Sequence, residues 1–321
     1  MYNANVCYGA NNYNDILYFL SNTTIHPHID RIYFSCRSDI DSPEKTLFSV
    51  IEENVHTLNL HKHDDMWIKR SKYKRIKLYY CNETDVKISI LYERKKHYSY
   101  CPCMVINIYK PDIKTIDWFD AICNSLGILT TLSHVELTID FSPYEYGLQE
   151  FLQNHLFLKY NSGNIRFVGD DVFKSFYIGY RAKNSKSVIV YDKNVNDLNV
   201  LRLEFRLNRS FLKRHELELD CFDNINNIDL SSLISFKRIN RGKLSKHLQW
   251  RHKEQILRLG KGWRGVYVRQ LMSYLGYERS VANQIACMKG SPYKNNCQRF
   301  LEDMPEANEA LFGRLKNLKF I

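Results

Sequence analysis

The chain has 321 residues, 44% of them hydrophobic and 25% charged, and its 46 Lys and Arg outnumber its 35 Asp and Glu to give a net charge of +11. Such values are typical of a globular protein with one large or two ordinary domains, and the basic excess indicates a polyanionic partner, most commonly nucleic acid. No run of about 18 apolar residues or signal-peptide pattern is present, so we expect a cytoplasmic protein with no membrane partner. The nine irregularly spaced cysteines favour reduced thiols over a disulfide framework or a zinc site.

The hydrophobic patterns predict a sheet interrupted by helices. Strands are expected at 30–36 and 75–81, then a hairpin at 86–109, a helix at 112–129 and a strand at 133–141. A second helix at 147–160 is followed by a hairpin at 175–193 and a strand at 200–209. This order predicts an α+β fold: a mostly antiparallel sheet with helices on one face, in two strand–helix–strand halves, followed by a smaller basic helical domain.

A polar stretch rich in Asn and Asp at 218–232 is the expected linker between an α+β catalytic domain at 1–217 and a basic helical DNA-binding domain at 233–321. Residues 237–269 contain eleven Lys and Arg and a single acid, and this excess favours phosphate contacts over a merely solvated surface. A helix-turn-helix is a further interpretation of 265–290, with 281–289 as the groove-facing helix. The basic residues expected to contact DNA here are Lys237, Arg238, Arg241, Lys243, Lys246, Arg251, Arg264 and Arg269.

Two of the expected strands have one apolar side and one side that carries acids. Side chains alternate between the faces of a strand, so Glu136 and Asp140 share a face on one strand, and Glu204 lies on the polar face of the other. One interpretation is a solvated face with cross-strand ion pairs. The other is a hard oxygen site for Mg²⁺ or Mn²⁺, which could hold and polarise a phosphodiester.

The stretch Val188-Ile189-Val190-Tyr191-Asp192-Lys193 predicts a strand that ends on a tyrosine, with Lys193 on the same face as Tyr191. A strand end followed by a polar turn is the plain interpretation. Alternatively, Tyr191 is a nucleophile whose phenolate, with an unperturbed pKa of about 10, is favoured by a metal ion and a nearby ammonium. Its product would be a covalent phosphotyrosine that stores the bond energy. No nucleotide cofactor would be needed, and the sequence contains no phosphate-binding loop.

Four short motifs carry a family resemblance. They are His134-Val-Glu136-Leu-Thr-Ile-Asp140, Tyr177-Ile-Gly-Tyr-Arg181, Tyr191-Asp192-Lys193 and Arg202-Leu-Glu204-Phe-Arg206. In order and spacing the chain resembles, over about residues 86–215, the rolling-circle replication initiation proteins of the Rep_trans and filamentous-phage gene II types. It departs from the family pattern where His134 replaces an arginine and Glu136 an aspartate.

This resemblance implies a metal-dependent DNA endonuclease that nicks one strand at a double-stranded origin through a 5′-phosphotyrosine and later rejoins it, starting rolling-circle replication of a plasmid or phage genome. Tyr191 would be the nucleophile, with Lys193 beside the phosphate. Glu136, Asp140 and Glu204 would hold Mg²⁺ or Mn²⁺, and Arg181, Arg202 and Arg206 would contact DNA. Expected partners are an origin hairpin or single strand and the host helicase and polymerase machinery, and a homodimer is left open.

Two further features offer alternatives. His26 and His28, and likewise His61 and His63, flank a single residue, as in nickases that bind metal through two histidines. Both stretches look like loops, and a proline at 27 cannot donate to a sheet ladder, so surface histidines are expected. The rival function is a non-catalytic DNA-binding replication or copy-control regulator, which needs no acids around Tyr191. An RNA-binding role lacks the aromatic strand motif that would support it.

Overall fold

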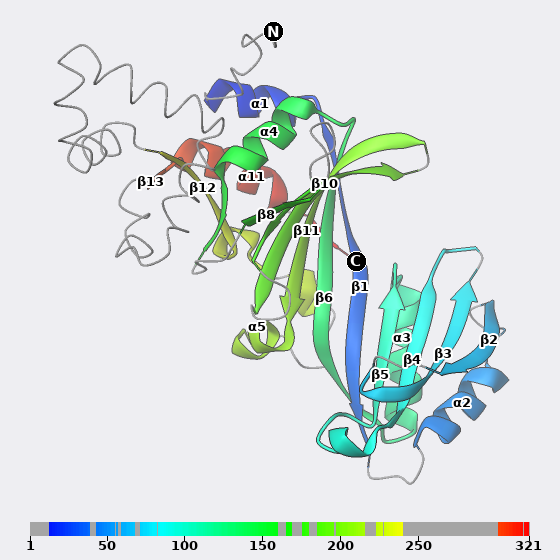
Figure 1. Cartoon of the computed structure of the whole chain (residues 1–321). Coiled ribbons are helices and arrows are strands. Elements are labelled where there is room, and N and C mark those ends of the chain that lie inside the picture. The colour runs from blue at the N-terminus through cyan, green and yellow to red at the C-terminus, as the bar shows by residue number, and fades with distance from the viewer. Residues whose placement is uncertain are drawn as a thin grey trace, which may run out of the picture.

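The computed structural model describes residues 13–38, 43–54, 56, 59–67, 71–81, 83–159, 165–168, 175–179, 185–195, 197–215, 223–226, 228–239, 301–316 and 318–320. Ten strands form one antiparallel sheet in the order β2-β3-β4-β5-β1-β6-β11-β10-β9-β8 (Figure 1). This arrangement confirms the predicted α+β fold with a mostly antiparallel sheet. The strands are β1 (Thr24–Arg37), β2 (Leu60–Trp67), β3 (Tyr73–Cys81), β4 (Lys87–Arg94), β5 (Met104–Tyr109), β6 (Leu129–Ser142), β8 (Ile165–Val168), β9 (Ser175–Ile178), β10 (Lys186–Val195) and β11 (Leu198–Asn208).

Strands β1 and β6 are the long central pair that joins the two halves of the sheet. β1 pairs with β6 from Thr24 to Arg37, but with β5 only from Arg31 to Cys36. Among the described strands, the first part of β1 therefore has a neighbour on one side only. That position tolerates Pro27, because a missing N–H can point away from the ladder.

The expectation that both histidine pairs lie in loops was wrong. The first pair lies in β1 and the second in β2. Pro27 argues against a strand in the sequence, yet it pairs with Ile139 of β6 where β5 is absent. His61 is exposed on β2 near the far edge of the sheet, whereas His28 is half-buried on the central strand.

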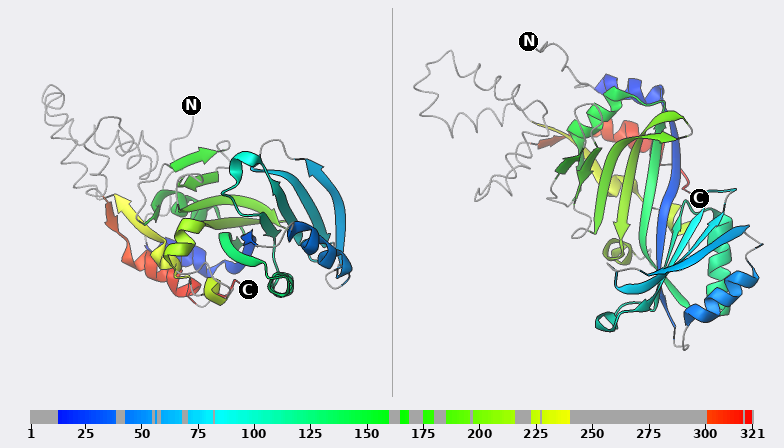
Figure 2. Two further views of the ribbon diagram at one scale, coloured as in Figure 1. Left: turned by 90° about the horizontal axis from the view of Figure 1, so that it is seen from below. Right: turned by 45° about the vertical axis from the view of Figure 1, so that its right-hand side comes forward.

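The helices lie on the apolar side of the sheet. The view from below shows α1, α3 and α11 together on one side of the strands (Figure 2). In α3, the Asp112 carboxylate caps the first turn by accepting a hydrogen bond from the Thr115 N–H at 2.7 Å, and Phe119 packs into the core. The helices are α1 (Tyr13–Ser21), α2 (Pro43–Glu53), α3 (Ile113–Ser125), α4 (Tyr146–His155), α5 (Arg209–Arg214), α6 (Asp223–Asn226) and α11 (Pro305–Leu315), with short 3₁₀ turns η2 (Lys96–Tyr98) and η3 (Leu230–Ser232).

A second, three-stranded sheet in the order β13-β12-β7 ties the end of the chain to this core. It consists of β7 (Leu156–Leu158), β12 (Ile234–Ile239) and β13 (Leu301–Asp303). Phe236 is fully buried with its ring centroid 5.4 Å from that of Phe151 on α4. Among the described helices, none is both long enough and apolar enough to cross a bilayer.

The described ends of the expected C-terminal domain therefore share the main hydrophobic core. Leu311 of α11 is buried in that core, as are Ile225 and Leu230 from the stretch expected to be a linker. Residues 240–300, which include the possible helix-turn-helix and most of the basic stretch, lie outside the described residues. A separate basic helical domain stays a prediction for that stretch.

Candidate active site

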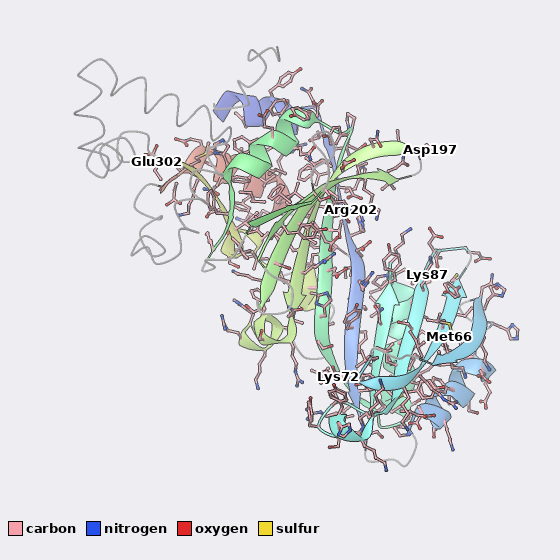
Figure 3. All side chains as sticks on the ribbon, in the orientation of Figure 1. Met66, Lys72, Lys87, Asp197, Arg202 and Glu302 are labelled. Carbon is pink, nitrogen blue, oxygen red and sulfur yellow. The ribbon has the colours of Figure 1, made fainter. Side chains whose placement is uncertain are left out.

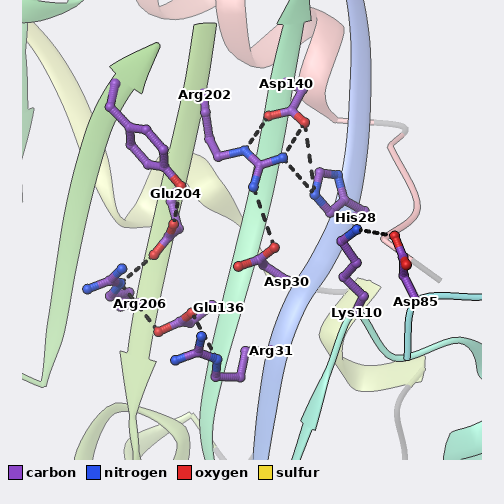
Figure 4. A network of polar contacts seen from close by, with 11 residues as sticks. His28, Asp30, Arg31, Asp85, Lys110, Glu136, Asp140, Arg202, Glu204 and Arg206 are labelled. Atoms are coloured by element: carbon purple, nitrogen blue, oxygen red, sulfur yellow. Dashed lines mark hydrogen bonds and ion pairs between the residues drawn. The ribbon is translucent and has the colours of Figure 1, made fainter. Parts of the chain in front are cut away.

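The strand register gathers the acids and Tyr191 on one face of the sheet. β11 pairs with β6 so that Arg202 lies opposite Asp140 and Arg206 opposite Glu136. β10 then places Tyr191 opposite Arg202. The opposite face of β6 and β11 is the apolar core, as strand alternation predicted. The polar side chains of these strands consequently form a network of two neighbouring groups of contacts, one round Arg202 and one that runs from Glu204 to Glu136 (Figure 4).

Tyr191 and Glu204 form the contact at the centre of this network. The Tyr191 hydroxyl donates a hydrogen bond to Glu204 Oε2 at 3.0 Å. Burial raises the pKa of Tyr191 well above its ordinary value, and the Glu204 carboxylate raises it further, whereas Arg202 acts in the opposite direction. Tyr191 is therefore a neutral phenol at neutral pH and needs a base to become a nucleophile.

Arg202 is held between two carboxylates. Its Nε and Nη2 each donate to the Asp140 carboxylate at 2.6 Å, and its Nη1 lies 3.4 Å from Asp30. Asp140 is 5% exposed and Arg202 2%. A bidentate guanidinium–carboxylate pair is the geometry that best compensates the cost of burying both charges.

A β-bulge in β1 brings Asp30 into the network. The register with β6 shifts between Ile29 and Arg31, so Asp30 is the extra residue. A bulge lets two residues of one strand oppose a single residue of its partner. As a result, Asp30 reaches the guanidinium of Arg202, and Arg31 reaches the carboxylate of Glu136.

His28 joins the network from the same strand. Its Nε2 lies 3.4 Å from Arg202 Nη2 and 4.0 Å from Asp140 Oδ2. Burial lowers the pKa of His28, Asp140 raises it and Arg202 lowers it, with a net decrease. The imidazole is therefore neutral at neutral pH, which makes it a hydrogen-bonding group or ligand rather than a cation.

Glu136 sits at the other end of the network, buried among positive groups. Arg206 Nε lies 3.3 Å and Arg31 Nε 3.8 Å from its carboxylate, and His134 Nε2 lies at 3.0 Å. Burial raises the pKa of Glu136, but His134, Arg206 and Arg31 outweigh it, so the pKa is lowered. Arg206 also donates to Glu204 and thereby links the two carboxylates.

Lys193 extends the same face beyond Tyr191. Burial lowers the pKa of its ammonium, and the Arg202 charge lowers it further. The nearby Asp30 and Asp140 raise this pKa in part, so both positive and negative charges act on the lysine. Lys110 is also close enough to act on Lys193, and it is itself paired with Asp85 at 2.9 Å.

The three expected metal ligands are not gathered round one point. Glu136 and Asp140 lie four residues apart on β6, or about 13 Å at about 3.3 Å per residue, whereas a metal–oxygen bond is about 2.0–2.6 Å. Each carboxylate, including Glu204, is engaged by at least one arginine. Over the described ranges, no group of three or more His, Cys, Asp and Glu side chains is placed to hold a metal ion. A shared single-ion site does not fit this arrangement, and metal binding stays a prediction that requires release of carboxylates from their arginines.

The other residues expected to contact DNA are placed as follows. Lys237 lies on β12, half-buried and paired with Asp303 at 2.9 Å, and Arg238 follows it opposite Glu302. Arg202 and Arg206 are committed to carboxylates within the network. The remainder lie outside the described residues: Arg181, Arg241, Lys243, Lys246, Arg251, Arg264 and Arg269.

Sequence reasoning missed three members of the network, Asp30, Arg31 and His28. All three come from β1: His28 follows the proline that makes the start of this strand look like a loop, whereas Asp30 and Arg31 begin the strand expected at 30–36 and were given no role there. The alternation of polar His26, His28 and Asp30 with Ile25 and Ile29 was the signal that could have found them.

No family model matches the chain, and no curated protein matches it significantly. A structural comparison finds similarity to a solved structure described as a rolling circle replication initiator protein from Geobacillus stearothermophilus. The sequence identity is 13% and the TM-score is 0.40, and the match covers 67% of this chain and 87% of that chain.

Proposed function

We propose that this protein is a replication initiator that nicks one DNA strand at an origin through a covalent 5′-phosphotyrosine and later rejoins it, starting rolling-circle replication. The observation that carries the proposal is the 3.0 Å hydrogen bond from the Tyr191 hydroxyl to Glu204 inside a network of arginines and carboxylates. The order of the four sequence motifs supports it. The hydrogen bond and the motifs together indicate a nucleophile, a base and positive charge at one site.

The proposed reaction is a transesterification. Tyr191 Oη attacks the scissile phosphorus while its proton passes to the Glu204 carboxylate, which lies within the distance at which a general base acts. The bond between phosphorus and the 3′ oxygen breaks, leaving the 5′ phosphate on Tyr191. The 3′ oxygen leaves as a hydroxyl after taking a proton from water. Rejoining is the reverse: the 3′ hydroxyl attacks the phosphotyrosine and releases the phenol.

Positive groups around Tyr191 would stabilise the charge that develops on the phosphate. Arg202 lies opposite Tyr191 in the ladder, and Lys193 follows two residues later on the same face. Arg202 is buried and held by Asp140, and a fixed charge in such a setting acts more strongly than one in solvent. Lys193 is half-buried. A bound phosphate can therefore reach Lys193 with less displacement of existing ion pairs than it would need to reach Arg202.

A divalent ion, Mg²⁺ or Mn²⁺, belongs to the proposal as a cofactor that would polarise the phosphodiester. The candidate ligands are Glu204 and Glu136, which meet at Arg206 and whose carboxylate oxygens are of the type these ions prefer, whereas Asp140 lies too far along β6 from Glu136 to bind the same ion. Because arginines occupy these oxygens, we propose that metal binds weakly to the free protein.

DNA is the proposed partner. Besides the arginines of the network, the basic stretch from Lys237 to Arg269 would supply phosphate contacts to duplex DNA at the origin. The proposal extends to the host helicase and polymerase, which would use the 3′ hydroxyl that nicking exposes.

The experiment that tests this function selects the cleaved sequence from a random pool. The full-length protein is incubated with single-stranded oligonucleotides of randomised sequence and with Mg²⁺ or Mn²⁺, and DNA that stays attached in denaturant is sequenced. The proposal expects recovery of one preferred sequence. A supercoiled plasmid carrying that sequence should then be converted to the open circular form. Tight DNA binding without any covalent capture would contradict the nicking function.

One observation favours a second candidate, the non-catalytic DNA-binding regulator. Every carboxylate of the network is engaged by a positive group, as expected for a network whose role is to hold the strands together. A regulator would give sequence-specific binding with no adduct in the same experiment.

A further inference from the structure

Two tyrosine rings and a lysine are presented together at one end of the sheet, and we call Lys72, Tyr98 and Tyr100 the tyrosine cluster. The two ring centroids are 6.1 Å apart, and Lys72 Nζ lies 5.9 Å from each of them. Tyr100 is 74% exposed. Single exposed aromatic residues are common on protein surfaces. Two rings sharing one ammonium instead offer π faces and positive charge at a single position.

The backbone that carries these rings is held by hydrogen bonds. The Lys95 N–H donates to the Lys72 carbonyl at 3.0 Å and joins the two loops that form the cluster. The Arg94 guanidinium donates to the carbonyls of Ser99 at 2.8 Å and Cys101 at 2.9 Å. The loop conformation is thus set before any partner binds, which lowers the entropic cost of binding.

The loop has the charge of a polyanion-binding surface. Residues 94–103 read Arg-Lys-Lys-His-Tyr-Ser-Tyr-Cys-Pro-Cys and contain no acid. Lys96 and His97 are exposed, as is Lys72 across the loop junction. The nearest acid in sequence, Glu93, is paired with Lys74 and Arg75. Aromatic rings interleaved with lysines are the combination that binds single-stranded nucleic acid by stacking and phosphate contact.

The tyrosine cluster and the Tyr191 site lie on the same side of the sheet. In the view from below, the segment at 95–103 lies on the side opposite α1, α3 and α11 (Figure 2). The Cys103 N–H donates to the Cys36 carbonyl at 3.0 Å, which places the loop at the end of β1. His28 of the network lies eight residues earlier on β1, or about 26 Å away at about 3.3 Å per residue. Figure 3 shows Lys72 near the foot of β1 and Arg202 well above it.

Side chains suited to the same ligand lie along β1 between the two positions. The Arg31 guanidinium lies over the Tyr109 ring, 5.2 Å from its centroid. The Tyr33 ring lies 5.0 Å from that of His134. Arg31, Tyr33 and Tyr109 are all partly exposed on this face. Aromatic and cationic side chains therefore continue along this face from the tyrosine cluster toward the Tyr191 site.

We propose that the tyrosine cluster binds a single-stranded segment of DNA that leaves the Tyr191 site along β1. Bases stack on Tyr98 and Tyr100, and phosphates contact Lys72 and Lys96. The path of this strand rests on the proposed nicking function, because that function places the scissile phosphate at Tyr191. Binding of single-stranded DNA at the cluster does not depend on nicking and can be measured without it.

The test measures affinity by fluorescence anisotropy for labelled oligothymidylates of about 4 to about 16 nucleotides, the range of site sizes for single-strand-binding folds. Tyr100→Leu keeps an apolar side chain and removes the π face, and Lys72→Ala removes the shared charge. Matched controls are Tyr18→Leu and Lys114→Ala, which change an exposed tyrosine and an exposed lysine elsewhere. Circular dichroism confirms that each variant is folded.

We expect Tyr100→Leu to weaken binding of the longer oligonucleotides by about 5- to 150-fold, the range for loss of one stacked base, with no change for the controls. Lys72→Ala should reduce the slope of log affinity against log salt by about 0.7, the value for one phosphate on a single strand. Iodouracil-substituted DNA should cross-link on irradiation to the peptide that contains Tyr98 and Tyr100.

Three results would overturn the inference: unchanged affinity in folded Tyr100→Leu, equal losses for blunt duplex and single strand, or cross-links confined to other peptides. The outcomes separate this inference from the proposed function. Cluster-dependent binding without any covalent adduct would support the inference and contradict nicking. Normal nicking of a short oligonucleotide with no contribution from the cluster would support the proposed function and contradict the inference.

Discussion

Tyr191 on β10 donates its hydroxyl hydrogen to Glu204 on β11 at 3.0 Å, although the two residues are not directly opposite in the strand ladder. Tyr191 faces Arg202, and Glu204 faces Ile189, so the contact is diagonal on one face of the sheet. A tyrosine side chain is long enough to reach such a diagonal neighbour. The contact joins the candidate nucleophile to a base.

Glu204→Gln should lower the rate of nicking by about 10²- to 10⁴-fold, the usual contribution of a general base, because the amide cannot accept the phenol proton. The side-chain volume is kept, so DNA affinity should stay within about twofold of wild type. Single-turnover cleavage of the selected oligonucleotide measures the rate. Glu306→Gln, an exposed position on α11, is the control. Wild-type rates in Glu204→Gln would leave that carboxylate a structural role only.

Arg202→Met should destabilise the fold by about 3–5 kcal/mol, because it leaves the buried carboxylates of Asp140 and Asp30 without their cation. Arg202→Lys should recover part of this loss, since an ammonium supplies charge but not two parallel hydrogen bonds. Urea denaturation measures both. Arg37→Met changes an exposed arginine at the end of β1 and should have little effect. A loss below about 1 kcal/mol in Arg202→Met would contradict the assigned pairing.

Apolar periodicity, of two in strands and of about 3.6 in helices, was enough to predict the sheet, the helix at α3 and the polar strand faces that carry Tyr191, Asp140 and Glu204. Side-chain direction follows from strand parity, which is local. The pairing of Arg202 with Asp140 and of Arg206 with Glu136 depends on the register between β6 and β11. Register is a property of two strands together, so the sequence could indicate acids on a face but not which cation each one meets.

The part of the site that comes from β1 was missed for a different reason. Pro27 makes the residues round His28 look like a loop, and the strand tolerates this proline because β5, the described neighbour on that side, pairs with β1 only from Arg31 onward. Asp30 reaches Arg202 from a β-bulge, and no residue type marks a bulge reliably in the sequence.

Nicking should require Mg²⁺ or Mn²⁺ and stop when EDTA is added. Because arginines occupy the candidate carboxylates, Mn²⁺ binding to the protein alone should be weak and should tighten in Arg206→Gln, which frees oxygens of Glu136 and Glu204. Electron paramagnetic resonance of free Mn²⁺ measures the binding. Arg37→Gln serves as the control. Full nicking activity in EDTA, or no change in Mn²⁺ binding for Arg206→Gln, would count against a carboxylate-bound ion.

Replacing residues 240–300 by an Asn-Gly turn should separate origin binding from strand cleavage. Ile239 and Leu301 are direct antiparallel partners, so a two-residue turn can connect β12 to β13 and keep α11 in the core. The shortened protein should fold and cleave the single-stranded oligonucleotide but lose tight duplex binding. Gel shifts at about 50 and about 200 mM salt compare the two proteins, because duplex affinity of the full chain should fall steeply over that range. Unchanged duplex affinity in a folded, shortened protein would contradict the role given to the basic stretch.

The central claim is that Tyr191 is the nucleophile, and the most direct measurement is the covalent adduct with the oligonucleotide. Tyr191→Phe removes one oxygen and keeps the ring, and Tyr177→Phe on the neighbouring strand β9 is the matched control. Wild type and Tyr177→Phe should each give a denaturant-stable adduct, which peptide mapping places on Tyr191 with the DNA 5′ phosphate attached. Tyr191→Phe should bind DNA normally and give none. An adduct of normal yield in Tyr191→Phe, or one mapped to another tyrosine, would contradict the claim.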